Sequence, residues 1–334
     1  MSETLSEAER QLLITAYELG RRQRPATDER LAKMGAGLFD EKLVDWEGAS
    51  DSLVKRDLLQ REDQVFSLTP SGWELAEKLD KEYFSTEFSQ TLVRSVKSAT
   101  YGRFCEIVYG KDLCQYNLSD MEQLDKLLEL LALTSESKVL DLGCGPGKIS
   151  EYISDTTYAR VTGLDYATEA IELAQKRTRA KRDRLSYQVG DIDKLHFPEQ
   201  SFDAIIAIDT LYFIGSLDQT MADLHRLLKP HGQLGIFHSQ LLRPDQPKEL
   251  LQVENTELAM ALSKAGFSFK TVAFSEHEAR LWQHERKAAE KLRSDFEAEG
   301  NLELCTSRID EAERMMKMYA SHCVARYLYH AIKP

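Results

Sequence analysis

Short apolar runs alternate along the middle of the chain with longer segments whose apolar residues recur every three or four positions. The runs predict buried strands, and the periodic segments predict the helices that join them. Five strands are expected at residues 138–142, 159–165, 185–189, 202–209 and 233–240. Such regular alternation predicts a parallel sheet with right-handed crossovers, in which ligands bind at the carboxyl ends of the strands.

The pattern changes on both sides of this region. After the fifth strand we expect a helix at 258–265, a sixth strand at 269–274, charged helices over 276–323 and a final strand at 325–332. Before it, residues 5–79 read as short helices, then a strand pair that includes a strand at 64–68, and then a further helix. The third of the short helices is expected to start at Ser50 or Asp51. That order predicts a winged helix in a domain of residues 1–84, followed by linking and capping helices at 85–136 and a main domain at 137–334.

The first strand ends in an aspartate and a glycine-rich turn, Asp141-Leu142-Gly143-Cys144-Gly145-Pro146-Gly147. Glycines let the backbone adopt positive φ and approach a ligand closely. A dinucleotide-binding fingerprint needs its third glycine one position later, where this chain has Lys148, which weakens that interpretation.

Acids also end the next two strands. Asp165 can accept hydrogen bonds from the two hydroxyls of a ribose. Asp191 can accept from the exocyclic amine of an adenine, and Ile192 can pack on its ring. The alternative is a generic α/β domain in which these acids only cap helices.

Together these residues resemble the class I S-adenosylmethionine-dependent methyltransferases, from about Tyr101 to the end of the chain. The resemblance implies a doubly wound, seven-stranded, mostly parallel Rossmann-like sheet whose last two strands are neighbours, the final one antiparallel, with a helical lid at 276–323. It implies S-adenosylmethionine as cofactor, S-adenosylhomocysteine as product and no metal. The implied cofactor-binding residues are Asp141, Gly143, Cys144, Gly145, Gly147, Asp165, Tyr166, Asp191, Ile192 and Asp209, the last through backbone facing the methionine amino group.

Aromatic residues concentrate just before the sheet, in the segment that folds over the methionine end of the cofactor in the resembled family. Tyr101, Tyr109 and Tyr116 are therefore candidates to line the cofactor or acceptor pocket, because an aromatic face attracts a cation. Trp282 belongs to an apolar stripe on the expected lid. Ordinary core packing is the competing interpretation for all four residues.

Methyl transfer needs a general base only when the acceptor arrives protonated. His238, after the fifth strand, and Tyr212, after the fourth, are the candidates to orient or deprotonate an acceptor. Plant-type small-molecule O-methyltransferases have a catalytic histidine shortly after the fourth strand, where this chain has Leu211-Tyr212-Phe213. The expected reaction is methylation of an O or N nucleophile on a small organic molecule.

The net charge of the chain bears on which partners it can bind. The 334 residues carry a formal net charge of −12, and residues 1–82 hold 18 acids against 12 bases, which disfavours nucleic acid. We therefore expect the winged helix to pack or to form a homodimer. Two alternatives stay open: a nucleic acid or protein acceptor docked by the winged helix, and a non-catalytic regulator that binds S-adenosylmethionine.

The remaining features concern location. Five scattered cysteines without a CxxC pair argue against disulfides and a zinc site. The first residues, Met1 to Thr4, show no basic region followed by an apolar one, and no run is long enough to span a bilayer. These features predict a cytoplasmic protein with no membrane contact.

Overall fold

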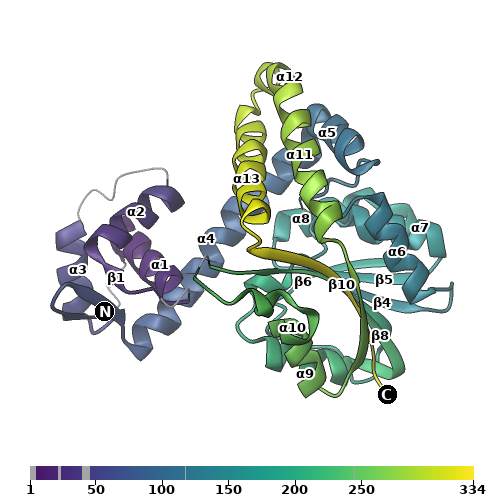
Figure 1. The fold of residues 1–334 in the computed structure, drawn as a ribbon, viewed down its shortest axis with the longest axis horizontal. Helices are drawn as coiled ribbons and strands as arrows, with labels where there is room; N and C mark the ends of the chain where they lie inside the picture. Colours follow the sequence, from purple (N-terminus) through teal and green to yellow (C-terminus); the bar gives the residue numbers. More distant parts are fainter. Residues whose placement is uncertain (1–4, 22–23, 40–45, 117, 244) are drawn as a thin grey trace. The chain divides into compact units, whose positions relative to one another are not determined.

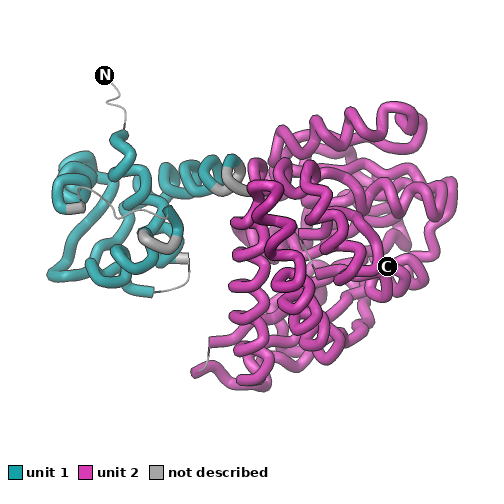
Figure 2. The backbone as a smooth tube through the Cα atoms, turned by 90° about the horizontal axis from the view of Figure 1, so that it is seen from above, with its two compact units in different colours: residues 1–88 teal, residues 89–334 magenta. Residues whose placement is uncertain are grey.

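The chain divides into two compact units, which are described separately. The computed structural model describes residues 5–21, 24–39, 46–116, 118–243 and 245–334, so Met1 to Thr4 lie outside it. Residues 1–88 form the first unit and residues 89–334 the second (Figure 2). The division falls within helix α4 (Pro70–Lys97), whose last residues belong to the second unit.

The first unit contains helices around a small antiparallel sheet. Its elements are α1 (Glu7–Arg21), β1 (Ala26–Thr27), α2 (Asp28–Phe39), α3 (Trp46–Lys55), β2 (Leu59–Glu62), β3 (Val65–Leu68) and the first part of α4. The strand order is β1-β3-β2, and the core includes Leu12, Leu31, Leu53 and Phe66. This order of elements agrees with the predicted winged helix, which remains a prediction.

The start of α3 differs from the sequence prediction. The helix begins at Trp46, so the prediction that Ser50 or Asp51 caps it is wrong. The Ser50 hydroxyl donates to the Glu47 carbonyl 3.0 Å away, inside the helix. A serine can bond either a free amide at a helix start or a carbonyl one turn earlier, and the sequence does not distinguish these cases.

The second unit is built on a seven-stranded sheet. Its strands are β4 (Lys138–Leu142), β5 (Arg160–Asp165), β6 (Leu185–Val189), β7 (Phe202–Ile208), β8 (Leu228–Leu241), β9 (Ser268–Ala273) and β10 (Val324–Ile332). The order is β6-β5-β4-β7-β8-β10-β9, with β10 antiparallel to both of its neighbours and the first five strands parallel. The predicted doubly wound, mostly parallel sheet is confirmed.

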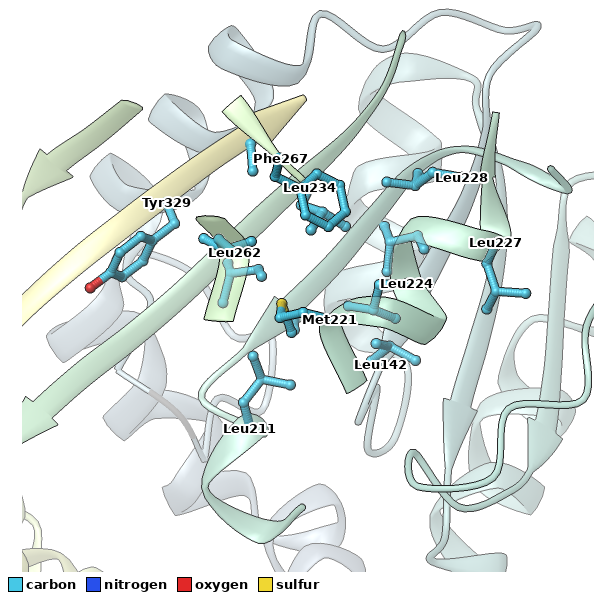
Figure 3. Packing of buried hydrophobic residues seen from close by; sticks show 14 of the residues in the cluster. Leu142, Leu211, Met221, Leu224, Leu227, Leu228, Leu234, Leu262, Phe267 and Tyr329 are labelled. Carbon is cyan, nitrogen blue, oxygen red and sulfur yellow. The ribbon is translucent and has the colours of Figure 1, made fainter. Parts of the chain in front are cut away.

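Helices cover both faces of this sheet (Figure 1). They are α5 (Ala99–Tyr109), α6 (Met121–Leu131), α7 (Lys148–Thr157), α8 (Thr168–Arg177), α9 (Leu217–Leu227), α10 (Glu257–Lys264), α11 (Ser275–Lys291), α12 (Arg293–Ala298) and α13 (Leu302–Ala320), with short 3₁₀ turns at Arg179–Lys181, Leu211–Phe213, Lys248–Leu251 and Val253–Asn255. On one face Met221 and Leu224 of α9 and Leu262 of α10 pack with Leu142 and Leu234 of the sheet (Figure 3). On the other face α6, α7 and α8 form a second cluster. Burial on both faces explains the almost wholly apolar strand β7.

A third cluster joins α5 to α11, α12 and α13. We call these four helices, with the connecting residues 110–116 and 118–120, the cover. Glu299 at the end of α12 accepts from the Thr100 amide (2.8 Å) and the Ser98 hydroxyl (2.6 Å), which ties the lid helices to the start of α5. No helix in the described part of the chain is long and apolar enough to cross a bilayer.

Candidate functional site

The glycine turn after β4 has the backbone conformation that its sequence predicts. Gly143, Gly145 and Gly147 have φ of +68°, +51° and +69°, which side chains disfavour. A Cβ on Gly143 would lie 2.2 Å from the Thr210 methyl, whereas a Cβ on Gly145 would meet only Leu92, at 3.9 Å. Gly145 therefore borders open space at the carboxyl edge of the sheet.

The two acids nearest this turn are buried and hold it in place. The Ser150 hydroxyl of α7 donates to Asp141, and burial raises the pKa of Asp141 to about 7. Asp165 accepts from the Gly145 amide (2.8 Å) and the Ala167 amide (2.9 Å), and burial raises its pKa as well. Asp165 thus links the glycine turn to the end of β5.

The end of β6 is more open. Asp191 and Ile192 are half-buried, and Asp191 accepts from the Asp193 amide at 2.9 Å. Ile192 packs against the cluster under α9, and Tyr166, after β5, is 37% exposed. Because β4, β5, β6 and β7 run parallel, all these residues lie at one edge of the sheet.

Asp209, the residue after β7, is tied to a buried arginine. Its two carboxylate oxygens accept from the Arg326 guanidinium at 2.6 and 2.8 Å, and Arg326 is fully buried in β10. Asp209 has φ +55°, and its side chain is 13% exposed. Arg326 therefore holds a non-glycine residue in the left-handed region at the floor of the site.

Arg326 also binds the cover. Its Nε donates to Gln123 of α6 at 2.9 Å and lies 3.6 Å from Glu278 of α11. Glu278 is fully buried and accepts from Trp282 Nε1 (3.0 Å) and the Tyr319 hydroxyl (2.6 Å). One arginine thus connects β10, the end of β7, α6 and the lid helices.

The structure places the two candidate catalytic residues against each other. Tyr212 and His238 stack with ring centroids 4.5 Å apart. The Tyr212 hydroxyl donates to Asp209 (3.2 Å) and accepts from the Ser239 amide (2.7 Å), and burial raises its pKa. Burial lowers the pKa of His238 to about 4, so its imidazole is neutral at pH 7 and weakly basic.

The aromatic candidates lie in the cover. Tyr101, Tyr109 and Trp282 are almost fully buried in its cluster, as the packing interpretation expects. The Tyr101 hydroxyl donates to the Gln115 carbonyl at 2.9 Å. Tyr116 is half-buried, and the Arg308 guanidinium lies 4.3 Å from its ring centroid.

A second buried ion pair lies beside these tyrosines. Glu285 of α11 is fully buried, 3.5 Å from Arg308 of α13, and accepts from the Tyr109 hydroxyl at 3.2 Å. Burial raises the pKa of Glu285 to about 7 despite the arginine, because the pair is long and Arg308 also binds Glu311. Glu285 therefore changes charge near neutral pH.

Open α/β sheets bind ligands outside the carboxyl ends of the strands, at the point where the strand order reverses, which here lies between β4 and β7. We call this place the crevice, and its residues fit the implied cofactor. It offers a glycine turn with open space at Gly145, a carboxylate at the end of β5 and another at the end of β6. It also holds two buried polar atoms without a hydrogen-bond partner among the described residues, Thr210 Oγ1 and Gln115 Nε2. Among all the residues that the structure describes, no group of three or more His, Cys, Asp and Glu side chains could hold a metal ion.

Several residues of the site were not predicted. Arg326 had a signal in the sequence, because it is a charged residue in an otherwise apolar strand. Glu278 and Glu285 had none, because α11 carries many charges and the sequence does not tell which face is buried. Gln115 and Thr210 are ordinary polar residues in connecting segments.

Sequence comparison places a known domain on this sheet. Residues 140–236 match the family described as "Methyltransferase domain". Methyltransferase GfsG of Streptomyces halstedii is 35% identical over 114 residues, 34% of this chain and 41% of that protein. Sterol 24-C-methyltransferase ERG6B of Gibberella zeae is 29% identical over 180 residues, 53% of this chain and 43% of that protein. The chain thus spans less than half the length of these relatives.

The fold agrees with this match. Phosphoethanolamine N-methyltransferase 2 of Haemonchus contortus, solved with phosphomonomethylethanolamine and S-adenosylhomocysteine, superposes with a TM-score of 0.61 at 19% identity, covering 73% of this chain and 59% of that one. At this identity the likeness concerns the fold alone. The sequence match places a methyltransferase domain at residues 140–236. The strand order and the superposition show that the second unit has the Rossmann-like fold expected of the class I S-adenosylmethionine-dependent methyltransferases.

Proposed function

We propose that this protein is an S-adenosylmethionine-dependent methyltransferase that methylates a small organic molecule and releases S-adenosylhomocysteine. The observation that carries the proposal is the crevice between the ends of β4 and β7, with open space at Gly145 and acids at the neighbouring strand ends. The family match over residues 140–236 supports the same cofactor. No metal enters the proposal.

Each strand end has a role in holding the cofactor. Asp165 binds the ribose, because each carboxylate oxygen retains a lone pair after accepting from Gly145 and Ala167. Asp191 and Ile192 bind the adenine, with Tyr166 beside them. The glycine turn, with Asp141 and Cys144 behind it, and the backbone at Asp209 surround the amino-acid end.

The bound cofactor supplies an electrophilic methyl group and its own leaving group. The remaining work of the chain is to hold the acceptor in line and to exclude water. The cover supplies the enclosure, with the half-buried Tyr116 in its connecting segment and Trp282 packed behind it in the cluster.

We assign Tyr212 and His238 to orientation of the acceptor. A phenol that already donates to Asp209 and whose pKa is raised does not take up a proton. An imidazole with a pKa of about 4 is a weak base at pH 7. Replacing His238 by Ala should therefore leave the pH profile of turnover unchanged between pH 6 and 8, whereas a general base would shift it.

The acceptor is proposed as an O or N nucleophile on a small molecule. The names of the relatives include methylation at carbon as well as at nitrogen, and the acceptors in those names, a sterol and phosphoethanolamine, are both small organic molecules. We also propose that the protein acts in the cytoplasm, because its five cysteines are all free.

A labelled-methyl assay tests the proposed activity. The full chain is incubated with methyl-labelled S-adenosylmethionine and a small-molecule cell extract, and label transfer and S-adenosylhomocysteine are measured by mass spectrometry. We expect transfer with the natural chain, a large loss with Asp191→Ala, and little change with Asp183→Ala, which replaces an exposed aspartate. Cofactor binding without methyl transfer to any molecule in the extract would instead favour a non-catalytic regulator.

We further propose that the first unit mediates a homodimer. Two apolar residues on this acidic unit, Val54 of α3 and Val65 of β3, are 40% and 39% exposed. Sedimentation of the full chain should show a dimer that Val54→Glu weakens. A monomer at all concentrations would reject the proposal.

A further inference from the structure

The segment between α5 and α6 crosses the crevice at the carboxyl edge of the sheet. At its start Leu113 packs in the same cluster as Cys144 and Ile149, beside the glycine turn. At its end the Leu118 amide donates to Asp209 at 3.4 Å, beside the end of β7. Gln115 and Tyr116 therefore lie over the point where the chain turns from one half of the sheet to the other, which is where such sheets bind ligands.

Gln115 has one hydrogen-bonding group that nothing satisfies. The side chain is 1% exposed, and its Oε1 accepts from the Leu113 amide at 2.9 Å. This bond fixes which amide atom is oxygen, because a flipped amide would bring two N–H groups together. Nε2 then remains as a buried donor with no partner among the described residues. An unpaired buried donor is costly, which favours a ligand that accepts a hydrogen bond from it.

Thr210 repeats this feature on the floor of the crevice. It follows Asp209 at the end of β7, and its methyl group fills the space beside Gly143. Its Oγ1 is buried without a hydrogen-bond partner within the described ranges. Thr210 follows Asp209, and the segment that carries Gln115 is attached to Asp209 through Leu118, so both unsatisfied atoms belong to parts of the chain at the carboxyl edge of the sheet.

We propose that Gln115 binds the α-carboxylate of the cofactor by donating a hydrogen bond from Nε2. This inference rests on the proposed function and names a binding residue for it. The amino-acid end of the cofactor is a zwitterion with no net charge, so a neutral amide and a hydroxyl suit it. Of the charged groups around the crevice, Lys148 is paired with Asp112 and Arg326 with Asp209.

The burial of Gln115 has a consequence for how the ligand enters. Because the Gln115 amide is enclosed, residues 113–116 must shift before a ligand can reach Nε2. The contacts at Lys148 (2.8 Å to Asp112) and Asp209 fasten the segment on the two sides of the crevice. We infer that binding includes a movement of residues 113–116, which lie between these two contacts.

Gln123 provides a matched control in the same cover. It is also a fully buried glutamine, but its Nε2 donates to the Leu118 carbonyl (2.6 Å) and its Oε1 accepts from Arg326 (2.9 Å). Replacement of either glutamine by Met removes an amide and keeps the side-chain volume. Of the two glutamines, only Gln115 has an Nε2 with no hydrogen-bond partner among the described residues.

The test is calorimetric titration of the full chain, in its natural form and as Gln115→Met and Gln123→Met, with two probes. The first probe is S-adenosylhomocysteine, and the second is its decarboxylated analogue, which keeps the thioether and the amine. We expect Gln115→Met to bind S-adenosylhomocysteine roughly tenfold more weakly, the loss typical of one hydrogen bond to a charged group. Its affinity for the decarboxylated analogue should stay within about twofold of the natural chain.

Other outcomes overturn the inference. Equal losses for both probes in Gln115→Met would mean that Gln115 only shapes the segment, and no loss would mean that it does not contact the ligand. Carboxylate-selective loss in Gln123→Met would assign the contact to α6 instead. If Gln115→Met does not fold, Gln115→Glu keeps the acceptor for the Leu113 amide and should show the same selective loss at pH 7.5. If the natural protein binds neither probe, the proposed function is rejected together with the role of Gln115. If the natural protein binds both probes and only the Gln115 results disagree, the role of Gln115 alone is rejected.

Discussion

Two arginines are buried in the second unit, Arg326 between the sheet and the cover and Arg308 inside the cover, and they are paired very differently. Arg326 donates to Asp209, Gln123, Ser119 and Ser239, so each of its three nitrogens has a partner. Arg308 reaches Glu285 only at 3.5 Å, binds Glu311, and leaves its Nε without a partner among the described residues.

The difference separates a fixed attachment from an adjustable one. Asp209 sits in the left-handed region at the floor of the crevice, and a fully satisfied arginine holds it there. Glu285 has a pKa near 7, so the charge that faces Arg308 changes under ordinary conditions. The cover is therefore joined firmly to the strand ends and more loosely within its own interior.

The largest expected effect is the loss of the fixed pair. Arg326→Met leaves the Asp209 carboxylate unpaired, which costs roughly 3–5 kcal/mol of unfolding free energy for a buried pair. Arg308→Met should cost only about 1–2 kcal/mol, because Glu285 can take up a proton and become neutral. Urea unfolding at pH 7 measures both values, and equal losses would remove the distinction between the two arginines.

The second prediction tests whether Asp209 and Arg326 act as one unit. Asp209→Asn should cost about 2–3 kcal/mol in the natural chain and much less in Arg326→Met, since the charge it removes is then unpaired. A double-mutant cycle from urea unfolding gives the coupling energy. Additive losses would show that the two side chains contribute independently.

The third prediction concerns pH. The pKa of Glu285 is about 7 in the folded chain against about 4.3 in an unfolded one, so the folded chain binds this proton more tightly. Its contribution is complete below about pH 4.3 and is lost as pH rises through 7. Glu285→Gln stays neutral, so its stability relative to the natural chain should increase between pH 5 and 8, by up to a few kcal/mol.

Asp141 titrates in the same range, but it does so in both proteins and cancels from the difference. Thermal unfolding at a series of pH values provides the measurement. Parallel stability curves for Glu285→Gln and the natural chain would mean that Glu285 is ionised throughout this range. The interpretation that its pair with Arg308 changes charge near neutral pH would then be wrong.

The smallest effect is expected at Tyr109. Its hydroxyl donates to Glu285 at 3.2 Å, and Tyr109→Phe removes this bond at a cost of about 0.5–1.5 kcal/mol. The loss should be greater at pH 8 than at pH 5.5, because a hydrogen bond to an ionised carboxylate is stronger. Tyr101→Phe is the control, since its hydroxyl donates to a neutral carbonyl and its loss should not depend on pH.

Features that depend on neighbours in sequence were predicted well. The strands of the large sheet and the glycine turn follow from apolar runs and from glycines at fixed positions. The structure has these strands within a few residues of the predicted bounds, except that β8 begins at Leu228, five residues before its predicted start. The antiparallel final strand followed from the family resemblance. The start of α3 failed because Ser50 bonds within the helix.

Features that depend on pairs far apart in sequence were not predicted. Arg326 meets Asp209 across 117 positions, and Glu278 meets Arg326 from a helix with many charges. The sequence suggested tyrosines and a histidine as site residues because their chemistry is recognisable. It could not show that Tyr101 and Tyr109 pack inside the cover, or that His238 lies against Tyr212.

The measurement that tests the central claim most directly is titration of S-adenosylhomocysteine into the natural chain, Gly145→Ala and Gly300→Ala. Both glycines have positive φ, +51° and +72°, so alanine strains each backbone similarly, but only Gly145 borders the crevice. We predict saturable binding to the natural chain and to Gly300→Ala, and at least a tenfold loss in Gly145→Ala. Absence of binding to the folded natural chain, or unchanged affinity in Gly145→Ala, would contradict the claim that the crevice holds the cofactor.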